Sequence, residues 1–203
     1  LSIDLVDRLT FSDGDSLHVA GGGPDVPAGD DNLVRRALAL VDRRAAVRLE
    51  KAIPSGAGLG GGSADAAAVL RWAGCEDLEV AARLGADVPF CLRGGRARVT
   101  GVGEELEPLP FEAATFTLLT PPVHCSTMEV YRAWDELGGP TGEGPNDLEP
   151  AALVVAPELR DWRELLGEAT GRTPVLAGSG STWFVDGAFP GEDRVVVQAL
   201  PAY

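Results

Sequence analysis

The spacing of hydrophobic and polar positions predicts alternating strands and helices along most of the chain. Residues 2–11 alternate apolar and polar side chains, as a half-buried strand does. From Leu33 to about residue 43 the apolar residues recur at helical spacing, and Asp31 or Asn32 can cap this helix. The other predicted strands are residues 16–20, 47–53, 97–102, 115–119, 175–176, 182–185 and 194–200, and the other predicted helices are 63–71, 78–84, 126–137 and 157–166.

This alternation implies a mixed α/β or α+β chain in two parts. The proline-rich stretch 108–110 lies between two predicted strands and is the candidate boundary between the parts. Loops rich in glycine and proline are predicted over residues 21–30 and 138–145.

A run of glycines joins the predicted strand 47–53 to the alanine-rich helix that follows it. Residues 53–68 read Ile-Pro-Ser-Gly-Ala-Gly-Leu-Gly-Gly-Gly-Ser-Ala-Asp-Ala-Ala-Ala. Glycine lets the backbone turn tightly and approach a ligand without a Cβ in the way, and the first amides of a helix favour an anion. A flexible linker would lack the strand before it and the apolar helix behind it. The context therefore indicates a loop that binds a nucleotide polyphosphate.

Two better-known phosphate motifs fit this loop poorly. Residues 56–61 match the dinucleotide fingerprint formally, but Pro54 and Ser55 separate the strand from the first glycine, and no acidic strand end follows about 20 residues on. A P-loop is excluded because no glycine is followed by Lys-Ser or Lys-Thr. The single lysine, Lys51, precedes the loop. Phosphate charge must therefore be met by backbone amides, Mg²⁺ or arginine.

Composition and charge narrow the class of partner. The 203 residues carry a formal net charge of −14, which argues against binding to nucleic acid or to an anionic membrane. No apolar run approaches the roughly 18 residues of a membrane span. Cys75, Cys91 and Cys125 are widely spaced and odd in number, which fits a reducing cytoplasm and predicts neither a disulfide framework nor a zinc site. With only two histidines, no metal-ligating side chains are predicted.

Three further segments carry candidate chemistry. Asp87 lies in the apolar stretch 85–90, where a carboxylate is costly to bury unless it is paired or used. It can orient or accept the proton of an attacking hydroxyl in phosphoryl transfer, or it can cap the amides of a helix-terminating turn. The turn Gly178-Ser179-Gly180 enters a strand and is unspecific by itself. The polar cluster 146–149, beside a Pro/Gly loop, can be a helix cap.

In this order, these segments resemble the galactokinase, homoserine kinase, mevalonate kinase and phosphomevalonate kinase (GHMP) superfamily. Within it they look like the branch that acts on a cytidine-diphosphate-linked methylerythritol in the non-mevalonate isoprenoid pathway. The resemblance spans most of the chain and rests on residues 32–37, 51–67, 85–90, 101–104, 146–149 and 177–181. Its specific part is the glycine run combined with the segment 85–90.

The resemblance implies an α+β two-domain GHMP kinase fold, with an α/β N-terminal ATP-binding domain over residues 1–112 and a ferredoxin-like C-terminal domain over 113–203. The implied activity is transfer of phosphate from ATP, with Mg²⁺, to the 2-hydroxyl of a small cytidine-diphosphate substrate, in the cytoplasm, by a monomer or weak homodimer. Asp87 would be the catalytic carboxylate. The implied ATP-binding residues are Asn32, Lys51, Pro54, Gly56, Ala57, Gly58, Leu59, Gly60, Gly61, Gly62 and Ser63, and the implied substrate-binding residues are Thr127, Gly178, Ser179 and Gly180.

The chain also departs from the family pattern. The family begins with a strand that carries a catalytic lysine and an asparagine, and neither precedes Leu1, so this strand and its lysine are expected to be missing from the sequence as written. After Val185 only residues 186–193 stand where the family has another helix. Two alternatives stay open: another small-molecule kinase of the superfamily, of the homoserine or mevalonate type, or a nucleotide-binding protein without catalysis.

Overall fold

The computed structural model describes residues 1–22, 26–139 and 144–203, so parts of the predicted loops 21–30 and 138–145 lie outside the described residues. The chain divides into two compact units. The first unit comprises residues 1–55, 60–113 and 199–203, and the second comprises 56–59 and 114–198. The glycine run is therefore shared between the units, and residues 199–203 belong to the first. Among the described residues, no helix is both long and apolar enough to cross a bilayer.

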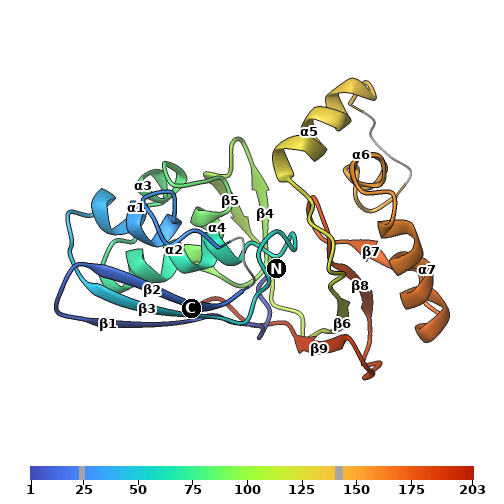
Figure 1. Cartoon of the computed structure of the whole chain (residues 1–203), viewed down its shortest axis with the longest axis horizontal. Helices are drawn as coiled ribbons and strands as arrows, with labels where there is room; N and C mark the ends of the chain where they lie inside the picture. The colour runs from blue at the N-terminus through green and yellow to red at the C-terminus, as the bar shows by residue number, and fades with distance from the viewer. Residues whose placement is uncertain (23–25, 140–143) are drawn as a thin grey trace. The chain divides into compact units, whose positions relative to one another are not determined.

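The first unit is built on a three-stranded sheet. Its elements are β1 (Arg8–Ser12), β2 (Ser16–Gly21), α1 (Leu33–Leu40), β3 (Ala46–Lys51), α2 (Gly61–Trp72), α3 (Leu78–Ala82), α4 (Val88–Arg93), β4 (Ala97–Thr100) and β5 (Glu105–Pro108). The central strand is β3, which is antiparallel to β1 and parallel to β2. Figure 1 shows α1 and α2 alongside this sheet, and side chains from the sheet and from α1, α2 and α4 form one core.

Alternation along β3 decides which face of the sheet is covered. Val47 and Leu49 are buried in the core of the first unit, whereas Arg48 and Glu50 point away from it and form an ion pair at 3.1 Å. The helix α2 brings small side chains against this face, because Ala66 and Ala67 are fully buried. Small residues let a helix lie close to its neighbours, so the alanine-rich sequence favours tight packing of α2.

The chain end returns to the first unit. Ala199 pairs with Ile3 in an isolated β-bridge, and Leu200 N donates to Ser2 O at 2.9 Å. The Arg71 guanidinium at the end of α2 lies 4.3 Å from the centre of the Tyr203 ring. These contacts hold the first and last residues of the chain together at the edge of this unit.

The second unit is a four-stranded antiparallel sheet with helices on one face. Its elements are β6 (Thr115–Leu119), α5 (Thr127–Glu136), α6 (Glu149–Val155), α7 (Leu159–Thr170), β7 (Val175–Leu176), β8 (Trp183–Asp186) and β9 (Arg194–Gln198). The strand order β7-β8-β6-β9 is that of a ferredoxin-like unit. The three helices lie together beside the sheet in Figure 1, and the fully buried Trp183 is the largest side chain of this core. Residues 187–193 join β8 to β9 without a helix, as the sequence indicates.

Three short elements and the start of the first strand are the largest differences from the prediction, and the other predicted bounds differ by four residues or fewer. The six-residue α4, the four-residue β5 and the seven-residue α6 were not predicted. Elements of this length contain too few repeats for a periodic pattern to stand out. The first strand begins at Arg8 and not at residue 2. The reason is that Asp7 turns its side chain toward the end of β3, where it accepts hydrogen bonds from Ala52 N and Ile53 N.

Candidate functional site

The first half of the glycine run, residues 56–59, packs on the turn 177–181 within the second unit. Thr182 N donates to Ala57 O at 3.1 Å. A Cβ on Gly58 would collide with Ala177 O and would lie 2.7 Å from Gly180 O, and the φ of Gly58 is +72°. Position 58 therefore requires glycine both for its backbone conformation and for the space it leaves.

The turn itself is held by hydroxyl and glycine contacts. Gly178 also lies close to the glycine run, because a Cβ on Gly178 would lie 3.1 Å from Gly58 O. Ser179 is buried, and its Oγ lies 3.0 Å from Thr127 Oγ1 at the start of α5. Ser126 caps this helix by accepting from Glu129 N at 3.4 Å. The predicted substrate-binding residues 127 and 178–180 thus gather around residues 56–59.

Asn146 supports the same turn from the segment before α6. Its Nδ2 donates to Leu176 O at 2.8 Å and to Gly178 O at 2.7 Å. Its Oδ1 accepts from Leu148 N at 2.9 Å. This last bond lies before α6, whose N-cap residue Leu148 has no capping side chain, so the helix-cap interpretation of this cluster is wrong. The two bonds to the glycine turn were missed, because no pattern in one sequence relates residue 146 to residue 178.

The second half of the glycine run lies at the N-terminus of α2 in the first unit. Gly60 has a φ of +67° and precedes α2, and no side chain among the described residues caps this helix. Its first amides are therefore available to water or to an anion. A Cβ on Gly62 would lie 3.5 Å from Leu33 Cδ1, the residue after Asn32. Pro54 is exposed and Ser63 is partly buried.

Asn32 is the N-cap residue of α1. Its Oδ1 accepts from Val34 N at 2.8 Å, and its Nδ2 donates to Pro27 O at 2.6 Å. The structure therefore gives this side chain a local role in shaping the start of α1. The next residue, Leu33, lies close to Gly62, which places Asn32 near the second half of the glycine run. The implied contact of Asn32 with ATP stays a prediction.

Lys51 is buried in an ion-pair triad with two carboxylates. Its Nζ lies 2.8 Å from Asp65 Oδ2 and is also paired with Asp7 Oδ2. Neither aspartate was predicted as a site residue. The sequence held one signal: Asp65 stands among alanines of an apolar helix, and a buried carboxylate there needs a cationic partner. The structure thus pairs Lys51 with protein carboxylates, and its contact with adenosine stays a prediction.

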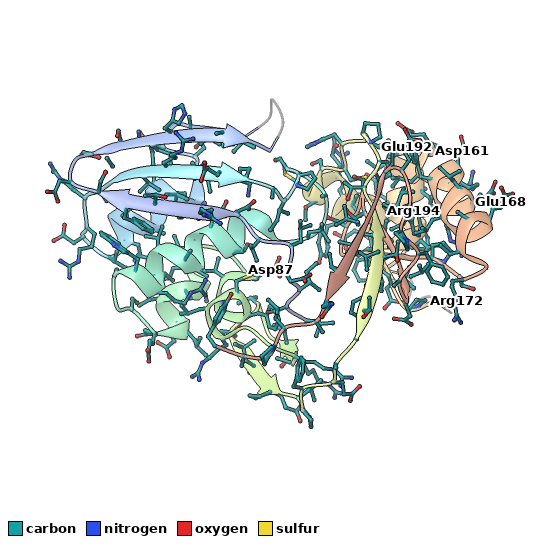
Figure 2. All side chains as sticks on the ribbon, turned by 90° about the horizontal axis from the view of Figure 1, so that it is seen from below. Asp87, Asp161, Glu168, Arg172, Glu192 and Arg194 are labelled. Carbon is teal, nitrogen blue, oxygen red and sulfur yellow. The ribbon has the colours of Figure 1, made fainter. Side chains whose placement is uncertain are left out.

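Asp87 is exposed at the start of α4, and its side chain makes no capping hydrogen bond (Figure 2). The apolar stretch therefore does not bury this carboxylate, and the cost of burying an unpaired charge does not arise. The stretch buries Val88 and Pro89 instead. The carboxylate is also not the helix cap of the alternative interpretation. Gly103 packs against the backbone just before Asp87, because a Cβ at position 103 would collide with Ala86 O.

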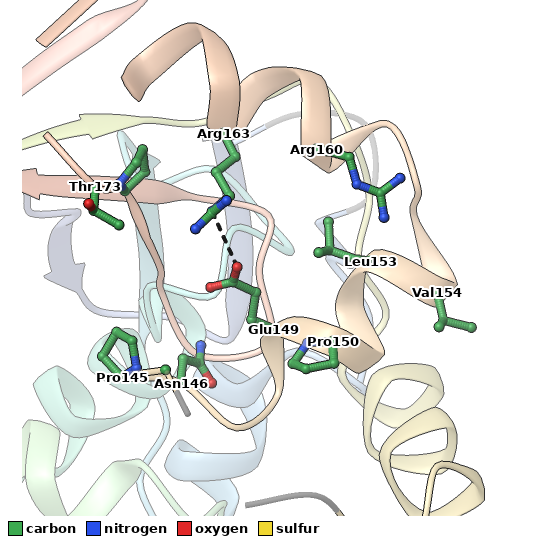
Figure 3. Close-up of a pocket in the computed structure, with 11 residues that line it drawn as sticks. Pro145, Asn146, Glu149, Pro150, Leu153, Val154, Arg160, Arg163 and Thr173 are labelled. Atoms are coloured by element: carbon green, nitrogen blue, oxygen red, sulfur yellow. Dashed lines mark ion pairs between the residues drawn. The ribbon is translucent and has the colours of Figure 1, made fainter. Parts of the chain in front are cut away.

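A pocket of about 640 Å³ lies in the second unit between α6, α7 and the segment before β7 (Figure 3). Arg163 Nε faces Glu149 Oε1 across it at 3.3 Å. Burial raises the pKa of Glu149, and the guanidinium of Arg163 opposes that shift. Asn146 lines this pocket and also binds the glycine turn, so the pocket adjoins the turn.

The predicted site residues thus form two groups. Asn32, Lys51 and residues 60–63 lie around the N-terminal end of α2 in the first unit. Residues 56–59, Thr127 and the turn 178–180 lie together in the second unit. Asp87 immediately precedes α4, which packs against α2.

Comparison with known proteins identifies the class to which the chain belongs. The pattern of the family described as "GHMP kinases N terminal domain" matches residues 32–95, a range that holds Asn32, Lys51, the glycine run and Asp87. A homoserine kinase from Cytophaga hutchinsonii, 19% identical, shares the fold with a TM-score of 0.63 over 97% of this chain and 85% of its own. The fold and the glycine loop are therefore those of a GHMP kinase, an ATP-using small-molecule kinase.

More similar relatives identify the family within this class. A 4-diphosphocytidyl-2-C-methyl-D-erythritol kinase from Cereibacter sphaeroides is 38% identical over 98% of this chain and 83% of its own length. The protein of the same name from Pelotomaculum thermopropionicum is 40% identical over 90% and 77%. A crystal structure of 4-(cytidine 5'-diphospho)-2C-methyl-D-erythritol kinase is 32% identical, with a TM-score of 0.70 over 97% of this chain and 87% of that one. The chain belongs to the 4-diphosphocytidyl-2-C-methyl-D-erythritol kinase family.

Proposed function

We propose that this chain transfers the γ-phosphoryl group of ATP to the 2-hydroxyl of 4-diphosphocytidyl-2-C-methyl-D-erythritol. The observation that carries the proposal is the glycine run 56–63, which is followed by a helix without a side-chain cap. The relatives that match nearly the whole chain are named as kinases of this substrate. The homoserine kinase likeness supports the fold alone, at 19% identity. The substrate of the named relatives is therefore preferred.

The backbone of residues 56–63 would bind the phosphates of ATP. The fit is supported by the positive φ angles of Gly56, Gly58 and Gly60 and by the free amides at the start of α2. Asn32 and Lys51 would lie near the adenosine. Among the described residues no three His, Cys, Asp or Glu side chains gather as a metal site. Mg²⁺ would therefore be held mainly by the phosphate oxygens, whose charge it would neutralise.

Asp87 would act on the acceptor hydroxyl. An exposed carboxylate with no capping bond is free to orient that hydroxyl and to take its proton as the phosphoryl group is transferred. Thr127 and the turn 178–180 would contact the cytidine-diphosphate substrate. On this proposal residues 1–112 serve as the ATP-binding domain and residues 113–203 as the C-terminal domain.

The test is ADP release from MgATP with and without the cytidine-diphosphate substrate, for the unmodified protein, for Asp87→Asn and for Glu79→Gln. Glu79 is an exposed acid on α3 in the same unit, so its variant controls for lost surface charge. We expect substrate-dependent release that falls at least about 10²-fold in Asp87→Asn, with ATP binding retained. Homoserine and mevalonate serve as competing acceptors. Preference for either, or equal loss of ATP binding and turnover in Asp87→Asn, would contradict the proposal.

A further inference from the structure

Two carboxylates share one ammonium group beneath the start of α2. The side chains of Lys51, Asp7 and Asp65 are 4%, 2% and 5% exposed. With all three groups ionised, this buried triad carries a net charge of −1. Burying an uncompensated charge is unfavourable, so the site is stable only if the surroundings or a proton offset it.

The triad contacts the chain on both sides of the glycine run. Before the run, Asp7 Oδ1 accepts from Ala52 N at 2.6 Å and from Ile53 N at 2.9 Å. After the run, Asp65 lies on α2, four residues beyond Gly61 and so about 6 Å along the helix. Between them, Lys51 Nζ lies 3.1 Å from the position of a Cβ on Gly61. The triad therefore joins the end of β3 to the beginning of α2.

Asp65 is the member of the triad with an unused oxygen. Its Oδ1 is buried and has no hydrogen-bond partner among the described residues. Burial raises the pKa of Asp65 to about 7, a shift that Lys51 opposes and Asp7 reinforces. Protonation would remove the net charge of the triad. The proton can be placed on Oδ1 while Lys51 keeps its contact with the opposite oxygen, Oδ2.

The groups that face Asp65 come from several elements. Lys51 comes from β3 and Asp7 from the segment before β1. Cys91 comes from α4, and burial raises the pKa of its thiol to about 12, so it stays neutral near pH 7. The buried face of α1 is formed by Val34, Ala37 and Leu38 and adds no charge.

We propose that Asp65 is a positioning residue that fastens the glycine run through Lys51 and Asp7, and that nucleotide binding draws a proton onto its carboxylate. This inference rests on the proposed function, which puts the phosphates of ATP on residues 56–63. A polyphosphate brings several negative charges to the N-terminus of α2, near the negative triad. A neutral triad is then favoured over a charged one, and by linkage the proton and the nucleotide strengthen each other's binding.

The test compares Asp65→Asn, Asp65→Ala, Glu79→Gln and the unmodified protein. Asparagine keeps an oxygen for Lys51 and holds the triad neutral, whereas alanine removes the link. ATP binding is measured by titration calorimetry at pH 6.5 and 8.5, in two buffers of different ionisation enthalpy. Subtracting the Asp65→Asn result removes the proton that ATP itself takes up or releases.

We expect the unmodified protein at pH 8.5 to take up a fraction of a proton more than Asp65→Asn. From pH 6.5 to pH 8.5, the ATP affinity of the unmodified protein should decrease by a factor about 3 to 10 times larger than the decrease in Asp65→Asn. Glu79→Gln should behave as the unmodified protein. Asp65→Ala should bind ATP about 10-fold more weakly than the unmodified protein at both pH values. Asp65→Asn should keep much of the affinity that Asp65→Ala loses.

Equal proton uptake and equal pH dependence in the unmodified protein and Asp65→Asn, with ATP bound by both, would overturn this inference alone. If Asp65→Ala does not fold, the pH dependence of Asp65→Asn decides the question. Absence of ATP binding by the unmodified protein would instead overturn the proposed function on which the inference rests.

Discussion

The hydroxyl oxygens of Thr127 and Ser179 lie 3.0 Å apart, which joins the first residue of α5 to the glycine turn before β8. Ser179 is buried and Thr127 is exposed, so the contact ties a surface residue of α5 to a buried residue of the turn. The contact joins two segments of the second unit to which the family resemblance assigns the substrate.

Replacing Thr127 with valine removes this contact and nearly preserves the shape of the side chain. A hydrogen bond of this kind contributes about 0.5–1.5 kcal/mol, so kcat/KM for the cytidine-diphosphate substrate should fall about 3- to 10-fold. Thr127→Ser keeps the hydroxyl and should retain more activity than Thr127→Val. Steady-state kinetics of the two variants measure the difference. Equal kinetics would show that the pair does not position the substrate.

Asn146→Asp should weaken the glycine turn from the other side. Aspartate keeps the acceptor for Leu148 N but loses both donors, and it places a carboxylate against Leu176 O and Gly178 O. Two lost bonds, with carbonyls left unpaired, should lower the free energy of unfolding by about 1–3 kcal/mol and reduce kcat/KM. Urea unfolding measures the first effect. Glu168→Gln on the exposed face of α7 is the control (Figure 2), and a loss as large in this control would contradict the assignment.

Gly58→Ala tests the close approach of the glycine run to the turn 177–181. Alanine is strained at a φ of +72°, and its Cβ would collide with Ala177 O. Gly171→Ala is the matched control, since Gly171 has a φ of +65° with nothing within 4 Å of its Cβ position. The control should cost about 1–2 kcal/mol of stability for the left-handed backbone alone. Gly58→Ala should cost clearly more, as judged by thermal unfolding, and similar losses would show that the contact is easily relieved.

Asp65 should make stability depend on pH. Because burial raises its pKa from 3.8 to about 7, the folded protein holds a proton that the unfolded chain releases between these values. The associated stabilisation is complete below about pH 4 and is lost as the pH rises through 7. Asp65→Asn has no such proton, so its stability relative to the unmodified protein should rise by up to about 3 kcal/mol between pH 5 and 8. Urea unfolding at several pH values measures this, and parallel curves for the two proteins would contradict it.

Local sequence was sufficient to predict many elements of the fold. Asn32, one of the two predicted candidates, caps α1, and Ser126, the first residue of the predicted helix 126–137, caps α5. As predicted, the glycine run follows β3 and leads into α2. Caps and turns depend on a few adjacent residues, so they can be read from one sequence. The short α4 escaped prediction because its position is set by burial of Val88 and Pro89 and not by a repeating pattern.

The candidate site shows the same difference between features that local sequence predicts and features that depend on tertiary packing. By itself, the sequence determined which residue types stand in the glycine run, at Asp87 and in the second glycine turn, because each is a contiguous motif with its own chemistry. Only the tertiary structure decided their partners. Lys51 meets Asp7 across 44 positions of sequence, Asn146 meets Gly178 across 32, and Gly58 meets Ala177. Contacts of this kind follow from how strands and helices pack around a common core, and packing depends on the whole chain, not on any one segment of it.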